Sequence, residues 1–107
     1  MDATAYVAPT AVLVGDVTVG RESRIMYGAV LDAEGASIGV GVCCIVCENA
    51  VVRATALGGA GHPVRIEEHA FISPHATLLG CTVEARAYIA AGATVLHGAQ
   101  VGTGAVV

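Results

Sequence analysis

Lysine and tryptophan are absent from this chain of 107 residues, and phenylalanine occurs once. Five arginines carry all of the basic charge against nine acidic residues, so the net charge is near −4 at pH 7. Nucleic-acid binding needs clustered cationic side chains, and we therefore expect no nucleic-acid partner. An anionic membrane surface is disfavoured for the same reason. The scarcity of bulky aromatic residues argues against helix packing, whereas the many small branched side chains suit strands.

Neither a leader peptide nor a spanning helix is recognisable in the sequence. The first residues, Met1 to Thr4, are not a positively charged segment that leads into an apolar run. Residues 87–107 carry no formal charge, but their glycines, threonines and Gln100 make a poor spanning helix, so we expect no membrane segment. Four cysteines without a secretory signal predict reduced thiols and a cytoplasmic protein. The length predicts one domain over residues 1–107.

Several catalytic motifs are also missing. The sequence contains no nucleophile elbow, phosphate-binding loop or dinucleotide fingerprint. Cys44 and Cys47 have a C-x-x-C spacing, but no second pair exists to complete a four-cysteine zinc site. We therefore interpret the cysteines, Cys43 and Cys81 included, as small core thiols.

What the sequence does contain is an aliphatic residue at every sixth position, in four blocks. Their members are Val7, Leu13, Val19, Ile25 and Leu31; Val40, Val46 and Val52; Ile66, Ile72 and Leu78; and Val83, Ile89, Val95, Val101 and Val107. Four residues beyond each of these positions up to Val101 lies a small or β-branched residue, most often alanine. A period of six fits neither an α-helix nor a lone half-buried strand.

The period does fit a parallel β-helix with three flat sides, in which three hexapeptides make one turn and the turns stack about 4.8 Å apart. The aliphatic residues then point inward, and the small residues let the chain pass the corners. Two segments, residues 32–37 and 55–63, interrupt the period, and we predict that both are loops that leave the prism.

Three stretches, VGDVTVGRESRIMYGAVL, PVRIEEHAFISPHATLLGCTV and YIAAGATVLHGAQVGTGAVV, resemble the gamma-class carbonic anhydrases and their ferripyochelin-binding-like relatives. The resemblance extends from Ala5 through the rest of the chain. It implies an all-β, single-stranded left-handed parallel β-helix that forms a homotrimer. It also implies a zinc ion held by three histidines from two neighbouring subunits, where a zinc-bound hydroxide attacks carbon dioxide.

The positions that the resemblance gives to the three zinc ligands are Arg53, Pro74 and Leu79, and none of them can donate an imidazole. We therefore predict no metal and no cofactor. The family's Arg-Gly-Asp stretch, whose Arg and Asp pair across the subunit interface, corresponds to Asp32 through Glu34, and two acids cannot make that pair. The implied trimer thus lacks an expected contact. A glutamine that positions the zinc-bound water is replaced by Cys47.

Four histidines remain: His62, His69, His75 and His97. In the stacking that aligns Ile72 with Ile89, His69 lies over Arg86, His75 over Gly92 and His97 over Gly80. No two histidines share a column, so we interpret them as solvated surface or interface groups.

Three functional hypotheses follow from the sequence. The first is a gamma-carbonic-anhydrase-like protein that has lost the zinc site and has a structural or assembly role. In it, Arg53 binds bicarbonate or another small anion, or pairs with a carboxylate such as Glu48 or Glu68. The second is a hexapeptide acyltransferase that uses His75 or His97 as a general base. The third is a carbonic anhydrase with a non-standard metal site.

Overall fold

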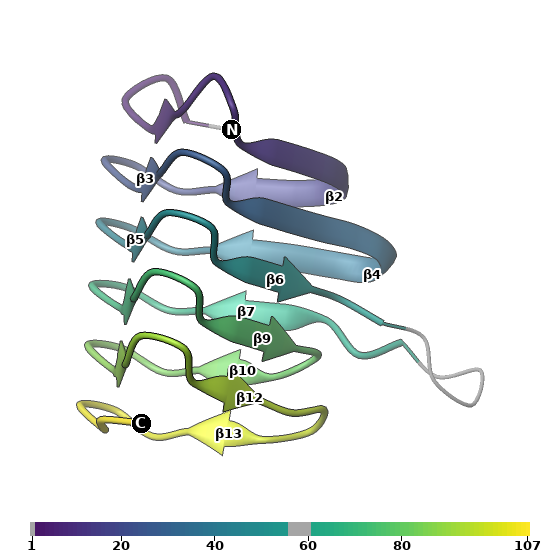
Figure 1. Ribbon diagram of the computed structural model, residues 1–107, viewed down its shortest axis with the longest axis vertical. Helices are drawn as coiled ribbons and strands as arrows, with labels where there is room; N and C mark the ends of the chain where they lie inside the picture. The colour runs from purple at the N-terminus through teal and green to yellow at the C-terminus, as the bar shows by residue number, and fades with distance from the viewer. Residues whose placement is uncertain (1, 56–60) are drawn as a thin grey trace.

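The computed structural model describes residues 2–55 and 61–107, and the regular elements in these ranges are all β-strands. One sheet contains five strands of two residues each, in the spatial order β1 (Tyr6–Val7), β3 (Arg24–Ile25), β5 (Ile45–Val46), β8 (Phe71–Ile72) and β11 (Tyr88–Ile89). Strands that follow one another in this order come from successive turns of the chain (Figure 1).

The second sheet contains eight strands. They are β2 (Val12–Val19), β4 (Val30–Val40), β6 (Val51–Arg53), β7 (Val64–Ile66), β9 (Thr77–Leu79), β10 (Thr82–Val83), β12 (Thr94–Val95) and β13 (Gln100–Val101). All pairs between named strands are parallel. No helix that could cross a membrane is found in residues 2–55 and 61–107.

Strand β4 explains why three sides form only two sheets. Its first residues pair with β6, and its last residues pair with β7, so the strand continues around a corner and joins two faces. We call the face made by β6, β9, β12 and the first halves of β2 and β4 the β6 face. The β6 face, the face that contains β7, and the five-stranded sheet are the three sides of a prism. The fold is therefore the left-handed parallel β-helix that was predicted.

The core consists of the predicted aliphatic columns. On the five-stranded side, Ile25 pairs in register with Val46, Val46 with Ile72, and Ile72 with Ile89. All four side chains are fully buried. Each column is continuous because every turn adds one aliphatic side chain directly above the previous one, and burial of that apolar surface is the main stabilising term.

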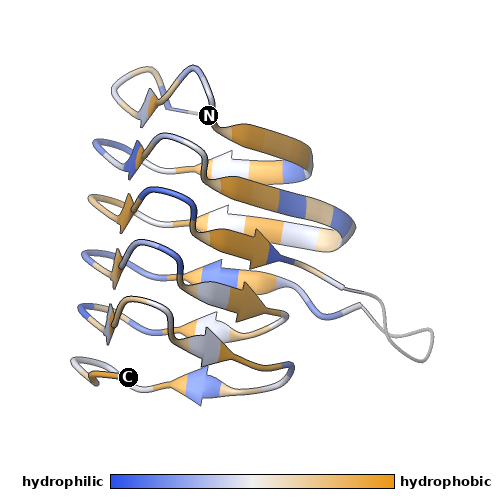
Figure 2. Ribbon diagram, viewed as in Figure 1, coloured by the Kyte–Doolittle hydropathy of each residue, from blue (hydrophilic) through white to orange (hydrophobic). Residues whose placement is uncertain are grey.

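One of the two predicted loops is wrong. Residues 32–37 do not leave the prism, because Val30 to Val40 form one extended strand. Strand β4 has 11 residues against 8 in its neighbour β2, and the register between them shifts between Gly15 and Val17. The extra residues are thus absorbed as an irregularity at residues 34–37, which have no partner in the ladder where β4 turns the corner of the prism (Figure 1). The middle of β4 is hydrophilic (Figure 2).

The second predicted loop, residues 55–63, falls largely outside the described residues, since 56–60 are not among them. Its two described ends meet: Thr55 and His62 form an isolated antiparallel bridge, and the Thr55 amide donates to the His62 carbonyl at 3.1 Å. This bridge fixes the backbone of His62 beside the end of β6.

The predicted stacking of corner residues is confirmed for His69 and His75. The amide of Arg86 donates to Glu68, the neighbour of His69, and the amide of Gly92 donates to Pro74, the neighbour of His75. Both histidines have a left-handed backbone, with φ of 59° and 63°, and both are exposed at corners of the prism.

Candidate functional site

Arg53 and Leu79 lie side by side on the β6 face. They end strands β6 and β9, where they are register partners, and Asp32 of β4 is the partner of Arg53 on its other side. All three line a pocket of about 400 Å³. Its other lining residues are Glu34, Gly35, Ala54, Thr55 and His97. The structure thus brings together two of the three expected ligand positions, both acids of the altered Arg-Gly-Asp stretch, and one candidate general base.

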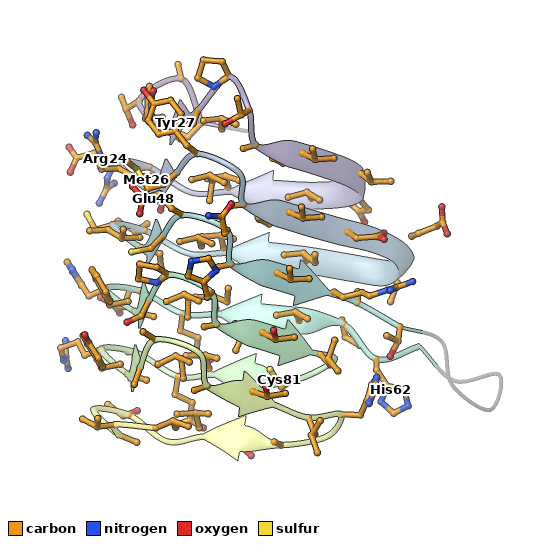
Figure 3. All side chains as sticks on the ribbon, in the orientation of Figure 1. Arg24, Met26, Tyr27, Glu48, His62 and Cys81 are labelled. Carbon is orange, nitrogen blue, oxygen red and sulfur yellow. The ribbon has the colours of Figure 1, made fainter. Side chains whose placement is uncertain are left out.

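Arg53 forms an ion pair with Asp32, and the distance from its Nε to the Asp32 Oδ2 is 4.0 Å. The predicted partners Glu48 and Glu68 are wrong, because β4 lies directly beside β6 and brings Asp32 next to Arg53. Figure 3 shows Glu48 on the opposite side of the β-helix from His62, which lies near the end of β6. With 59% of the Arg53 side chain exposed, the pair stabilises the fold by less than about 1 kcal/mol.

Pro74 and His75 are not part of this pocket. They lie in the turn between β8 and β9, at the opposite end of β9 from Leu79. His75 donates its amide hydrogen to the Glu48 carbonyl at 3.1 Å, and its side chain is exposed. An ion held by all three expected positions would therefore need residues from two chains.

The side chains at these positions do not fit a zinc ion. The Arg53 guanidinium is a permanent cation that is already paired with Asp32, leucine is apolar, and proline has no side-chain donor. In residues 2–55 and 61–107, no group of three or more His, Cys, Asp or Glu side chains is arranged to hold a metal ion. No catalytic step through zinc can be assigned to this donor set.

His62 and His97 are in contact although they share no column, so the interpretation of all four histidines as solvated surface or interface groups does not describe this pair. Their ring centroids are 5.9 Å apart, and the planes are inclined at 72° in an edge-to-face contact. The repeat could not reveal this contact, because His62 lies outside the hexapeptide register and reaches His97 through the antiparallel bridge to Thr55. The one feature of the sequence that permits this contact is Gly80, which lies beneath His97 and has no side chain that would collide with His62.

Two buried polar atoms in this region lack a hydrogen-bond partner among the described residues: the Nε2 of His97 and the Oγ1 of Thr55. Both residues line the pocket. A buried imidazole nitrogen without a partner is costly, and it is a donor or acceptor that an incoming ligand could satisfy.

The cysteines are free, and the predicted core position holds for three of them. Cys44, Cys47 and Cys81 are buried, and burial raises the pKa of each thiol. The half-buried Cys43 directs its thiol toward a Glu22 carboxylate oxygen at 3.6 Å, and burial followed by this contact raises its pKa as well. None of the four is an activated thiolate.

The fold and its repeat define a class, the hexapeptide-repeat left-handed β-helix proteins. A protein from Bacillus cereus assigned as an acetyltransferase superposes with a TM-score of 0.87 at 23% identity, over 99% of this chain and 63% of that one. A hexapeptide transferase family protein from Anaplasma phagocytophilum gives 0.70 at 26% identity, over 98% of this chain and 66% of that one. No protein-family model matches the chain.

Within this class, the chain is a relative of the gamma carbonic anhydrases and gamma carbonic anhydrase-like proteins. In Arabidopsis thaliana, mitochondrial gamma carbonic anhydrase 3 is 47% identical over 96 residues, which are 88% of this chain and 37% of that protein. Mitochondrial gamma carbonic anhydrase 1 is 40% identical over 103 residues, which are 94% of this chain and 38% of that protein. A mitochondrial gamma carbonic anhydrase-like protein, gamma carbonic anhydrase-like 2, is 39% identical over 82 residues, which are 75% of this chain and 32% of that protein.

The chain therefore spans less than two fifths of the length of these relatives. The resemblance found in the sequence is confirmed. The cytoplasmic location is not confirmed, since these plant relatives are mitochondrial proteins.

Proposed function

We propose that this chain is a gamma-carbonic-anhydrase-like β-helix without the three-histidine zinc site, and that its role is to pack against further β-helices as a trimer. The observation that carries the proposal is the register of Arg53 with Leu79. If the resemblance assigns the ligands correctly, these two positions face one pocket from one chain, and both have side chains that zinc does not accept.

The outward residues of the β6 face support an assembly role. Val12 and Val14 are 47% and 38% exposed at one end of this face, and Val30 and Val51 continue the Val12 column on the next strands. Leu96, 61% exposed, lies at the other end, beyond Asp32 and Arg53. Exposed apolar side chains on one face are typical of a protein–protein contact. Leu79 follows Leu78 in β9, and Leu96 follows its register partner Val95, so the two leucines occupy equivalent positions in successive turns. Apolar side chains therefore lie at the expected metal position and in the turn after it.

The proposal is tested by measuring carbon dioxide hydration by stopped flow, with the wild-type chain and with the variant Arg53→His/Pro74→His/Leu79→His. We expect the wild-type chain to leave the buffer rate unchanged with zinc supplied. The triple variant is expected to bind zinc at its three new histidines only when oligomeric, since those histidines come from two chains. Saturable hydration by the wild-type chain would refute the loss of catalysis.

A second candidate function, acyl transfer, is favoured by the buried and unpartnered Nε2 of His97. His97 lines the pocket, and an imidazole nitrogen can accept a proton from an acceptor hydroxyl or amine. His75 is a poorer candidate, because it is exposed at a corner away from the pocket. The test is incubation with acetyl-CoA and a panel of acceptors. Thiol release that disappears in His97→Ala but not in His75→Ala would support this function, and no release above background would exclude it.

Arg53 as an anion site remains the weaker part of the first hypothesis. Asp32 already balances its charge, and Glu34 adds a second carboxylate to the same pocket. An anion would therefore have to compete with Asp32. Isothermal titration with bicarbonate, compared between the wild-type chain and Arg53→Ala, decides whether any binding depends on this residue.

A further inference from the structure

His62 and His97 come from different turns of the β-helix and are held together by the backbone around them. The bridge to Thr55 fixes His62, and Gly80 separates the two histidines with no side chain of its own. A Cβ atom at Gly80 would lie 2.7 Å from the His62 Cβ and 3.1 Å from the His97 Cδ2. The two imidazoles therefore meet over a position that only glycine leaves open.

The His97 ring has a free donor atom at this contact. Its Nε2 is bonded to Cδ2, the atom that lies over Gly80, and it has no hydrogen-bond partner in the described part of the chain. Neutral imidazole is the commonest nitrogen ligand of transition metals in proteins. A nitrogen that is buried and unpaired gains both a partner and a charge interaction when it binds an ion.

The separation of the two rings suits a shared ion. Because a zinc–nitrogen bond is about 2.0–2.1 Å long, two imidazoles bound to one tetrahedral ion have ring centroids roughly 5 Å apart. The observed separation is 5.9 Å, so the rings need to approach by less than about 1 Å to share an ion. His62 is half-buried, so a side-chain rotation can convert the edge-to-face contact into coordination without moving the prism.

The charge of the adjoining pocket also favours a cation. Asp32 and Glu34 contribute two carboxylates against the single guanidinium of Arg53, which leaves one net negative charge beside His97. We infer that His62 and His97 form a two-imidazole binding site for a divalent transition metal, with zinc as an ion that suits these ligands. The remaining coordination positions are open to water or to an oxygen ligand.

The test uses zinc chloride as the probe and the full chain as the protein. Isothermal titration should give one saturable event per chain, and His62→Ala and His97→Ala should each weaken it at least tenfold. His75→Ala and His69→Ala are matched controls, because these two histidines are exposed at corners away from the pocket, and they should bind as the wild type does. Equal binding by all four variants, or no saturable event, would overturn the inference.

A second measurement needs no variant. Long-range proton–nitrogen spectra of the wild-type imidazoles should show that zinc shifts the His97 Nε2 and one nitrogen of His62, while the signals of His69 and His75 stay in place. Shifts confined to His69 or His75 would contradict the site. The inference goes beyond the proposed function and is independent of it, since these experiments record binding alone and the proposed function is decided by hydration rates.

Discussion

At the scale of single residues, burial sets the chemistry of the thiols. Cys81 is 2% exposed, and burial raises its pKa from 9.0 to about 11. Because the folded state holds its proton more tightly than the unfolded state, the stability that the neutral thiol contributes is complete below pH 9 and is lost as the pH rises through 11. We expect the free energy of unfolding to fall over this interval, and to fall less in Cys81→Ala. Urea titrations at several alkaline pH values measure the free energy of unfolding. The same dependence of this free energy on pH in the wild type and in Cys81→Ala would contradict the prediction.

Gly80 offers a second residue-scale prediction with a matched control. Gly80 and Gly92 both have positive φ, 47° and 74°, so alanine is strained at either position by about 1 kcal/mol. A Cβ at Gly92 meets open space, whereas at Gly80 it would collide with His62. We expect Gly80→Ala to lower the free energy of unfolding more than Gly92→Ala does, and to displace the imidazole signals of His62 and His97. Equal destabilisation, with those signals unmoved, would show that the two histidines are not held by Gly80.

The residues of the site could be predicted from the sequence only in part. The hexapeptide period gives the register, which aligns Arg53 with Leu79 and buries Cys44, whereas Cys81 was matched through the family resemblance. The contact of His62 with His97 could not be derived in this way, because it depends on an antiparallel bridge outside the repeat. The partner of Arg53 was missed because residues 32–37 were expected to leave the prism.

At the scale of elements, β4 illustrates how an insertion can remain inside a sheet. An acid- and glycine-containing segment normally predicts a turn. Here Val30 to Asp32 are anchored by β6, and Ile38 to Val40 by β7, so both ends of the insertion are hydrogen-bonded in neighbouring turns. Residues 34–37 have no partner in the ladders, so the insertion is held by the pairing of its two ends, a long-range effect that local composition does not reveal.

The pairing of β9 with β12 allows a test of the inward and outward columns. Leu78 is fully buried, whereas Leu96, which follows Val95 in the next turn, is 61% exposed. Removing the buried side chain leaves a cavity, so Leu78→Ala should cost about 2–5 kcal/mol of unfolding free energy. Leu96→Ala should change it by less than about 0.5 kcal/mol when the chain is monomeric. Urea unfolding at low protein concentration measures both, and similar costs would mean that the assigned register is wrong.

At the scale of the whole molecule, the fold was predictable because a single repeat specifies every turn. Each aliphatic residue lies in register with the one in the next turn, so a local spacing becomes a continuous core along the prism (Figure 1). The outer surface has no such rule, since outward positions need not repeat. The proposed contact face is therefore chosen from exposure in the structure, where the β6 face exposes Val12 and Val14 at one end and Leu96 at the other.

The proposed trimer gives the last prediction, and two exposed side chains on different faces test it. Leu96 follows β12 on the β6 face, whereas Tyr88 lies on β11 in the five-stranded sheet and is 44% exposed. If the β6 face forms the interface, Leu96→Asp places a carboxylate among apolar contacts, and burial of an unpaired charge dissociates the assembly. Light scattering after size exclusion should give about three times the chain mass of 10.6 kDa for the wild type and for Tyr88→Asp, and the monomer mass for Leu96→Asp. If Leu96→Asp remains trimeric, the interface does not include the Leu96 end of the β6 face. If the wild type is monomeric, the proposed assembly role is wrong.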